Sequence, residues 1–525
     1  MPSHRQHRAS SISVIISWLG SHSWIVYTLV LFVAAAIRFY DLGQPTTLVF
    51  DEVYYVRDAA AQMVFGYPTQ WPEDLEYAFG PDELARMGDQ ASFAVHPPLG
   101  KWLIAIGLAL FGADNGWGWR FSAALFGTGT VALLMVLTNR LTRSMWVTAL
   151  AGGLLAIEGV SAVMSRVSLL DGFLAFFALA GVLFVVLDHE WVLSRLSDTS
   201  VAAKRVLWWR PWLLAAALAF GSAASVKWSG FYFVAIFGVF IVIRDAVVRK
   251  RLARLHWMRD TALLQTPVTL LLTLPVVIAT YLASWAGWIF TAAGWNRQWS
   301  EAFQKTGIEA LLPDWLHNLW QYHVAMYTWH STLQAPHPYI AHPLTWPLAI
   351  RPTSMFFESA KLGEKGCAFS ECAWAITPIP NVLIWWGGIA ALVWLTVLVV
   401  RRALGKRTLL TAPRSPLFGR AAAFTLVAFA AGYLPWLVTF GRTAVFQFYT
   451  VVFAPYVVLA LALALWQLIV VGNTKDAQTA QSRRRVVTIF LIAAALLSAF
   501  FLPLWLGTQT PMWFWNIHMW MPSWR

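Results

Sequence analysis

Eleven apolar segments, each close to the length that crosses a lipid bilayer, constrain the fold of this chain more than any other feature. They cover residues 24–40, 119–138, 145–163, 167–187, 211–226, 228–244, 264–290, 382–400, 421–440, 447–471 and 486–506. A membrane-crossing helix needs roughly 17–25 residues, so several segments lie near the short end of that range. The 525-residue chain is 58% hydrophobic and 12% charged, with a mean hydropathy of +0.59. We therefore predict an all-α polytopic membrane protein with about eleven transmembrane helices.

Basic residues, which give the chain a formal net charge of +13, fall in short connections between alternate apolar segments. The clusters are Arg5 and Arg8; Arg140 and Arg143; Arg195, Lys204, Arg205 and Arg210; Arg244 to Arg259; Arg401 to Arg420; and Lys475 with Arg483 to Arg485. Cytoplasmic loops carry an excess of Lys and Arg, so we place these clusters and the N-terminus, residues 1–23, in the cytoplasm. Their positions favour contacts with anionic membrane lipids and argue against a nucleic-acid partner.

Two long stretches then fall on the external side, at residues 41–98 and 291–381. Long loops on one face of a membrane bundle are usually functional. Residues 99–112 are apolar but too short to cross, and we interpret them as a half-inserted helix on the outer side. Residues 382–525 contain the last four apolar segments and end outside. The whole chain, 1–525, is predicted to form a single membrane domain.

The first external stretch contains two adjacent carboxylates, Asp51 and Glu52. Apolar residues follow them at helical spacing, at Val53, Val56, Ala60 and Val64. This spacing predicts an amphipathic helix that lies along the membrane surface. Taken alone, the two carboxylates could simply favour the positive N-terminal end of that helix. Motifs in the rest of the chain are needed to choose between this alternative and a catalytic role.

The same stretch ends in His96-Pro97-Pro98-Leu99-Gly100-Lys101. Two prolines hold the backbone extended and predict a helix that begins near Pro98. Lys101 then lies in the first turn, where the helix dipole disfavours a cation unless an anion binds there too. A phosphate site with Lys101 and His96 is one interpretation, and a lysine that reaches the membrane interface is the other. Two further cations, Arg120 and Arg442, stand at helix ends that we place on the same external side.

Four ionisable residues interrupt apolar segments, and such residues are usually functional because each is costly in lipid. A structural ion pair between Glu158 and Arg166 is an equally good alternative for two of them. The four are Glu158, Arg166, Asp171 and Lys227.

The histidines and cysteines of the second external stretch do not indicate a metal site. His317, His323, His330, His337 and His342 have no familiar zinc spacing. Cys367 and Cys372 are the two cysteines of the chain, and in an oxidising compartment they favour a disulfide. The sequence also contains no nucleotide-binding glycine loop and no HExxH helix.

Motifs over nearly the whole chain follow one order. They are Phe50-Asp51-Glu52; His96 to Lys101; Ser165-Arg166 with Leu169-Leu170-Asp171; Lys227-Trp228-Ser229-Gly230; His337-Pro338-Tyr339; Trp346-Pro347; Arg351-Pro352; and Gly441-Arg442. Together they resemble the protein O-mannosyltransferases, which are membrane glycosyltransferases of the GT-C fold. That family carries its acidic pair in the first external loop, where the charge pattern places Asp51 and Glu52 here.

The resemblance implies a polyprenyl-phosphate-linked mannose donor and Ser or Thr hydroxyls of exported proteins as acceptors, with transfer by inversion at the outer face of a plasma membrane. It implies Asp51 as the base, with Glu52 positioning the acceptor backbone or a cationic neighbour. We expect four residues to bind the donor phosphate: Lys101, Arg120, His96 and Arg442. Supporting intramembrane residues are Glu158, Arg166, Asp171 and Lys227, and acceptor-loop residues are His337, Tyr339, Trp346 and Arg351. We expect no required cofactor, although a role for a divalent cation stays an alternative. Coupling to the secretion translocon is a further expectation.

Two departures from the family pattern are informative. Eukaryotic members insert a lectin-like MIR domain in the large external loop, and residues 291–381 are too few for one, which indicates a bacterial protein. Residues 446–449 read Phe-Gln-Phe-Tyr where eukaryotic members tend to have histidines. Two rival functions stay open: a GT-C enzyme that acts on a lipid or cell-wall glycan, and a transporter, although transporters tend to show inverted repeats and broken midplane helices.

Overall fold

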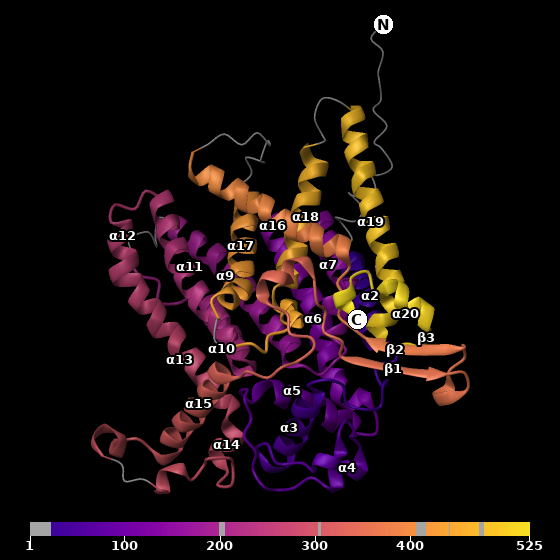
Figure 1. Cartoon of the computed structure of the whole chain (residues 1–525). Coiled ribbons are helices and arrows are strands. Elements are labelled where there is room, and N and C mark those ends of the chain that lie inside the picture. Colours follow the sequence, from indigo (N-terminus) through magenta and orange to yellow (C-terminus); the bar gives the residue numbers. More distant parts are fainter. Residues whose placement is uncertain (1–22, 199–204, 303–305, 406–415, 440–441, 472–476) are drawn as a thin grey trace.

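The chain folds into a predominantly helical bundle with smaller elements packed at one end (Figure 1). The computed structural model describes residues 23–198, 205–302, 306–405, 416–439, 442–471 and 477–525. Each of the eleven predicted apolar segments overlaps at least one helix, which confirms a mainly helical membrane fold. Almost all of the predicted cytoplasmic N-terminus (1–22) lies outside the described residues, as does Gly441.

The helices of the bundle have the following bounds. They are α2 (Ser23–Phe39), α6 (Gly116–Thr142), α7 (Met145–Ala156), α8 (Gly159–Val163), α9 (Leu170–Ser197), α10 (Pro211–Val226), α11 (Gly230–Arg251), α12 (Trp257–Arg259), η2 (Asp260–Gln265), α13 (Thr266–Ser284), α14 (Ala286–Phe290), α16 (Val382–Ala403), α17 (Pro416–Leu437), η7 (Gln447–Val452), α18 (Ala454–Val471) and α19 (Ala477–Leu506). Within the described ranges, seven of these stretches are long and apolar enough to cross a membrane alone: α6, α9, α11, α12 to α13, α16, α17 and α19.

Three predicted segments are broken helices, and one of them, 264–290, divides at Trp285 into α13 and α14. Segment 145–163 stops at Ala156 and restarts at Gly159, because the Glu158 carboxylate accepts hydrogen bonds from the free N–H groups of Val160 and Ser161. Segment 447–471 begins with the 3₁₀ turn η7 before α18 continues as a regular helix. The prediction of one continuous helix at each place was therefore wrong.

The core of the bundle lies around α9 and α18, most of whose apolar side chains are buried. α9 packs against α6 and α10, and α18 packs against α16. Glycines allow the closest approach, between α5 (Leu99–Phe111) and the start of α6. A Cβ at Gly107 or at Gly118 would overlap the backbone of the other element. Small residues at such crossings are typical of helix packing in membranes.

The two predicted external stretches form their own elements. The first contains α3 (Glu52–Phe65), α4 (Pro81–Ala85) and the short turn η1 (Glu73–Leu75). The second contains α15 (Asp314–Thr332), η3 (Trp299–Ala302), η4 (Gly307–Leu311), η5 (Pro343–Leu348) and η6 (Glu364–Gly366). The amphipathic helix after Asp51 and the helix start near Pro98 are both confirmed.

A small antiparallel sheet, which the sequence did not predict, accompanies the helices. Its strands are β1 (Phe356–Lys361), β2 (Glu371–Ile376) and β3 (Thr510–Pro511), in the order β1-β2-β3. β1 and β2 form a hairpin that projects from the bundle in Figure 1. The C-terminal helix α20 (Met512–His518) and the turn η8 (Pro522–Trp524) follow β3. β3 has only two residues and begins 134 positions after β2 ends. No local pattern in the sequence therefore predicts the sheet.

A buried ion-pair network joins three helices at residues that we predicted to be parts of basic cytoplasmic loops or left unassigned. Arg210 contacts Asp188 at 2.5 Å and Asp245 at 2.8 Å. Arg244 contacts the same two carboxylates, each at 2.6 Å. All four side chains are nearly inaccessible to solvent. The network therefore fixes α9, the start of α10 and α11 to one another.

Candidate active site

The Asp51 carboxyl group makes few contacts that stabilise the fold. The Tyr55 hydroxyl donates a long hydrogen bond of 3.4 Å to its Oδ2 atom. Asp51 stands at the N-cap of α3, but its side chain caps none of the helix N–H groups. The preceding residue, Phe50, has a φ of 49°, a left-handed conformation that non-glycine residues adopt rarely and that is enriched at functional sites. The carboxyl group of Asp51 is therefore free to accept a proton from another molecule.

Nearby charges and burial tune this carboxyl group. Burial of the half-buried Asp51 side chain raises its pKa to about 6, and the neighbouring carboxylate of Asp171 acts in the same direction. Lys227, the Tyr55 hydrogen bond and Arg442 oppose this rise in the pKa. A general base works best when its pKa lies near the operating pH. Asp51 meets that condition and is mostly ionised at neutral pH.

Glu52 has the opposite environment, although it is adjacent in sequence. It is completely buried, and the Arg120 guanidinium donates two hydrogen bonds of 2.9 Å to its carboxylate. The backbone N–H groups of Val49 and Ser168 donate to the same carboxylate at 2.9 and 2.8 Å. This full set of partners anchors the start of α3 to α6 and to the segment before α9. Glu52 thus contacts one cationic neighbour, Arg120, and fixes the first turn of α3, next to Asp51.

A pocket of about 340 Å³ lies beside Asp51. Two cations, Lys227 and Arg442, line this pocket, and both also lower the pKa of the Asp51 carboxyl group. The other lining residues are His96, Trp228, Ser229, Tyr232, Tyr327, His330, Ser331, Trp436 and Thr439. Cationic and hydroxyl groups on an aromatic wall suit an anionic ligand with an apolar part.

Both cations are held in place by fixed neighbours. Lys227 stands at the break between α10 and α11, where its ammonium contacts the Asp171 carboxylate at 3.0 Å and lies 4.2 Å from the centre of the Tyr449 ring. The Arg442 guanidinium lies 3.0 Å from Nδ1 of His330 and donates to the Tyr449 hydroxyl at 3.4 Å. The two charges therefore converge on one aromatic ring at the edge of the pocket.

The two histidines of the pocket are neutral. Nε2 of His330 lies 2.8 Å from the carbonyl oxygen of Val95 and must donate to it, so Nδ1 accepts from Arg442. Burial and Arg442 lower the pKa of His330 to about 4. Burial, followed by Lys227, lowers the pKa of His96 well below its usual value. Nδ1 of His96 is buried and has no hydrogen-bond partner in the described part of the chain.

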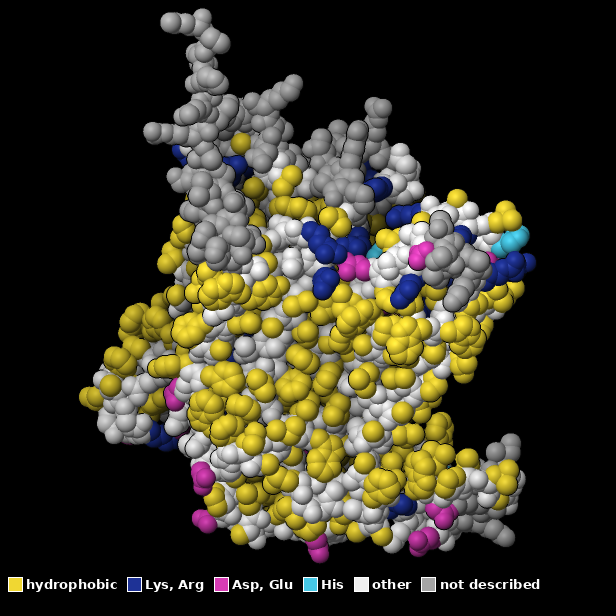
Figure 2. Space-filling view, turned by 180° about the vertical axis from the view of Figure 1, so that it is seen from behind, with side chains coloured by type: hydrophobic (Ala, Val, Ile, Leu, Met, Phe, Trp, Pro, Cys, Tyr) yellow, Lys and Arg dark blue, Asp and Glu magenta, His cyan; other side chains and the backbone are white. Residues whose placement is uncertain are grey.

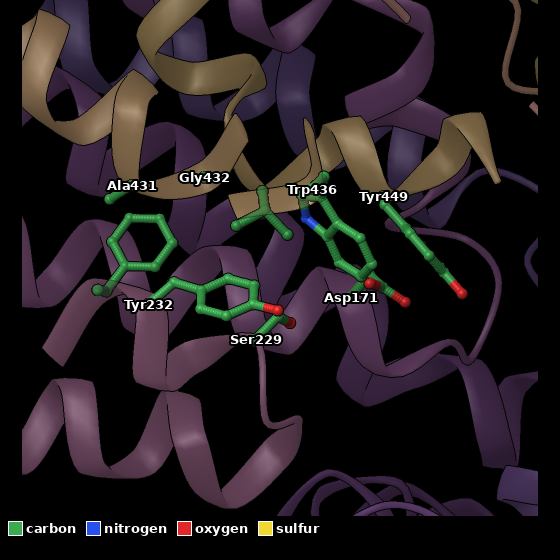
Figure 3. A pocket seen from close by; sticks show the side chains of 9 residues that line it. Asp171, Ser229, Tyr232, Ala431, Gly432, Trp436 and Tyr449 are labelled. Atoms are coloured by element: carbon green, nitrogen blue, oxygen red, sulfur yellow. The ribbon is translucent and has the colours of Figure 1, made fainter. Parts of the chain in front are cut away.

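A smaller cavity adjoins the pocket on the side of α17 (Figure 3). Asp171, Ser229, Tyr232, Trp436 and Tyr449 line it together with small residues of α17. The Ser229 hydroxyl faces both spaces and has no hydrogen-bond partner among the described residues. The cavity has a volume of about 10 Å³, which is room for one water-sized group, so these polar side chains can hold a single hydroxyl group of a larger ligand.

Two residues that we predicted to bind the donor phosphate lie elsewhere. Lys101 is 1% exposed, pairs with Asp58 at 2.9 Å and donates to the His96 carbonyl oxygen. Arg120 is equally buried against Glu52 and also donates to backbone carbonyls of residues 42–47. Neither lines the pocket. We therefore correct the assignment: the geometry favours Lys227, with Arg442 and His96, for an anion.

Glu158 and Arg166 serve the fold, but not as the ion pair that we considered. Glu158 caps α8, and Arg38 lies close to it as its strongest cationic neighbour. Arg166 donates to the carbonyl oxygens of Ile37, Arg38, Tyr40 and Leu506, at the ends of α2 and α19. In the part of the chain that the structure describes, no ion pair joins Glu158 to Arg166. Backbone carbonyls left free at helix ends explain why a buried arginine is needed there.

The four predicted acceptor-loop residues separate in the structure. The His337 ring packs edge-on against that of Phe50, the residue before Asp51, with ring centroids 5.7 Å apart. Tyr339 lines a different pocket. Trp346 is fully buried and donates to the Ala341 carbonyl oxygen, so a direct contact with an acceptor is wrong for this residue. Arg351 is half-buried, and its backbone N–H donates to the Gln447 side chain.

The predicted disulfide is present, between Cys367 and Cys372 at the tip of the hairpin of β1 and β2. Among the described residues, no group of three or more His, Cys, Asp or Glu side chains could hold a metal ion.

Several site residues were absent from the sequence-based assignment. Tyr55, Ser229, His330 and Tyr449 come from four separate parts of the chain, and their types are common at membrane interfaces. The useful signal was the run Lys227-Trp228-Ser229-Gly230, in which a lysine breaks two apolar segments. That run predicted a supporting role, whereas the structure places it in the wall of the pocket.

Comparison with protein families covers most of the chain. Residues 86–291 match the family described as dolichyl-phosphate-mannose-protein mannosyltransferase. Residues 315–524 match the C-terminal four-transmembrane region of protein O-mannosyltransferase.

Individual relatives agree with this assignment. The polyprenol-phosphate-mannose–protein mannosyltransferase of Mycolicibacterium smegmatis is 33% identical over 96% of this chain and 93% of that protein. Its namesake from Mycobacterium tuberculosis is 31% identical over 96% and 92%. The structure of the S. cerevisiae protein O-mannosyltransferase Pmt1–Pmt2 complex bound to the sugar donor shares the fold, with a TM-score of 0.71 at 16% identity over 95% of this chain and 92% of that one. The chain therefore belongs to the protein O-mannosyltransferase family.

Proposed function

We propose that this protein transfers mannose from a polyprenyl-phosphate-mannose donor to Ser or Thr hydroxyl groups of exported proteins. Family membership and the names of its bacterial relatives support the reaction class. The observation that carries the proposal is the pairing of an uncommitted carboxylate, Asp51, with a pocket whose cations are Lys227 and Arg442. A base and an anion site are the two elements that this transfer needs.

The chemistry is a single displacement with inversion. The acceptor oxygen attacks the anomeric carbon of mannose while the bond from that carbon to the phosphate oxygen breaks. The proton of the acceptor hydroxyl passes to the Asp51 carboxylate, and polyprenyl phosphate leaves with the electron pair. A phosphate is a good leaving group and needs no general acid, so one carboxylate suffices, unlike the pair in glycosidases.

The charges of the pocket match this leaving group. Lys227 and Arg442 stabilise the phosphate, whose negative charge grows as the bond breaks. The neutral His96 offers its free Nδ1 atom to the same ligand. Asp171 holds Lys227 in position and, with Ser229 and Tyr232, lines the small cavity, which can take one hydroxyl group of the mannose.

We place the reaction on the external side of a bacterial plasma membrane. In Figure 2, most visible basic side chains lie toward the upper end of the molecule and most visible acidic ones toward the lower end, with a broad hydrophobic band between. Basic residues favour the cytoplasmic side. In Figure 1 the lower end carries α3, α5 and α15, the elements around Asp51. Coupling to the translocon remains a prediction without a structural counterpart.

Mannosyl transfer by the purified protein tests this proposal. Radiolabelled polyprenyl-phosphate-mannose is incubated with a Thr-rich peptide and, in parallel, with extracted membrane lipids and cell-wall glycan. We expect label in the peptide, and loss of that label in Asp51→Asn. Asp89→Asn serves as the matched control, because Asp89 is an exposed carboxylate of the same external stretch. Label that enters only the lipid or glycan fraction would establish the rival glycosyltransferase function.

A further inference from the structure

A second pocket, of about 250 Å³, lies between the hairpin strand β1 and the C-terminal segment. Four aromatic side chains form most of its wall: Tyr339, Phe357, Trp515 and Trp524. Phe357 is 45% exposed, and its ring packs against that of Trp515 with centroids 4.8 Å apart. Ser354, Thr377 and the cationic Arg525 add polar positions. Neither the mannose donor nor the proposed base uses these residues.

A line of aromatic contacts connects this pocket to the candidate active site. Phe50, which precedes the base in sequence, contacts the His337 ring at 5.7 Å. His337 contacts Tyr339 at 5.9 Å, and Tyr339 reaches into the pocket. The two steps together lead from the ring of Phe50, the residue before Asp51, to the ring of Tyr339 over at most about 12 Å, which an extended polypeptide covers in about four residues. A chain with its hydroxyl at Asp51 can therefore place another side chain in the pocket.

The strand beside the pocket has a free edge. β1 is the outer strand of the sheet, and in the described residues it pairs with β2 on one side only. An exposed strand edge offers main-chain N–H and C=O groups to an extended peptide, while pockets beside it select side chains. The exposed Phe357 ring marks where such a side chain would arrive.

We infer that this aromatic pocket is a subsite for the acceptor polypeptide. It takes a bulky apolar or aromatic side chain about four residues from the Ser or Thr that receives mannose. An extended segment of the exported protein runs from Asp51 past His337 and Tyr339 to the edge of β1. The inference rests on the proposed function and adds a rule for choosing acceptor sites.

A peptide scan tests the inference. Peptides carry one central Thr in an Ala-Gly background, with a single Phe moved from two to seven positions away on either side. We expect the KM for the peptide to fall about tenfold when Phe lies about four positions away on one side, as burial of one aromatic side chain would give. Trp515→Ala and Phe357→Ala should remove this preference and leave the KM for the donor unchanged. Trp513→Ala is the matched control, because Trp513 belongs to the same helix but is 64% exposed and lies outside the pocket.

A cross-linking experiment decides the matter if either pocket variant fails to fold. A peptide with benzoyl-phenylalanine at the preferred position is photo-activated on the wild-type protein. We expect the label at Tyr339, between residues 354 and 377, or between 512 and 525. A label elsewhere, or a wild-type enzyme that mannosylates all peptides equally, overturns the subsite. If the wild type transfers mannose to no peptide, the proposed function itself fails.

Discussion

The Asp51→Asn variant should lose activity and gain stability together. In the proposed reaction Asp51 accepts the acceptor proton, and removal of a general base typically lowers the rate by about 10²–10⁴-fold. The amide of asparagine can still accept the Tyr55 hydrogen bond, so the geometry of the site is retained. A group that only supports the fold would show the opposite behaviour, because its replacement would lower stability.

The size of the stability gain follows from the raised pKa. Burial raises the pKa of Asp51 from 3.8 to about 6, so the folded protein binds this proton more tightly than the unfolded chain does. The stabilisation is complete below about pH 4 and is lost as the pH rises through about 6. Above that pH, ionisation of Asp51 costs the folded state at most about 3 kcal/mol. Partial exposure of the side chain reduces this cost, so we expect a gain on the order of 1–2 kcal/mol for the asparagine variant at neutral pH.

Chemical unfolding in mixed micelles, followed by tryptophan fluorescence, measures this difference. The variant should be more stable than the wild type at about pH 7.5, and the gap should close at about pH 4. Transfer assays on the same preparations should show the loss of rate, while Asp89→Asn changes neither quantity. An Asp51→Asn protein that is less stable at neutral pH, or that transfers mannose at the wild-type rate, would refute the assignment of this residue as a free base.

Four further predictions concern neighbouring residues and topology. Tyr55→Phe removes a hydrogen bond that lowers the pKa of the base, so the acidic limb of kcat/KM should move to higher pH; an unmoved limb would mean that another group is titrating. Arg442→Ala should raise the KM for the donor about 10–100-fold, as expected for the loss of a charge-assisted contact of about 1.5–3 kcal/mol, and an unchanged KM would place the phosphate elsewhere. Arg120→Ala should lower the free energy of unfolding by about 3–5 kcal/mol because Glu52 loses its buried partner, whereas a stable variant with weak donor binding would return this arginine to the phosphate site. Cysteines introduced at the exposed positions Gln70 and Lys250 should react with impermeant reagents from opposite sides of the membrane, and labelling from one side would contradict the topology.

Hydropathy was sufficient to predict the helical bundle, because the cost of exposing backbone polar groups to lipid leaves few alternatives to helices. It could not predict the break at Glu158, where one buried carboxylate replaces the helical hydrogen bonds of the next turn. The sheet was also missed, since β3 pairs with β2 across a long separation in sequence.

The candidate site shows the same division between local and tertiary information. The sequence identified the carboxylate pair, but it could not show that Glu52 is saturated by Arg120 while Asp51 is nearly free. Both residues have the same chemistry, and only their partners distinguish them. Cations were likewise recognised by type and misassigned by position: Lys101 is neutralised by Asp58, and Lys227 reaches the pocket.

The buried network of Asp188, Arg210, Arg244 and Asp245 also bears on how the protein is made. The partners stand on different helices and leave the ribosome in sequence, since Asp188 precedes Arg210 by 22 residues and Arg244 by 56. Released alone into lipid, α9 would carry a carboxylate without a partner, at a cost of several kcal/mol. Retention of α9 beside the insertion machinery until α10 and α11 emerge avoids that cost. The charges that hold the finished bundle together thus favour co-translational assembly of these three helices as one unit.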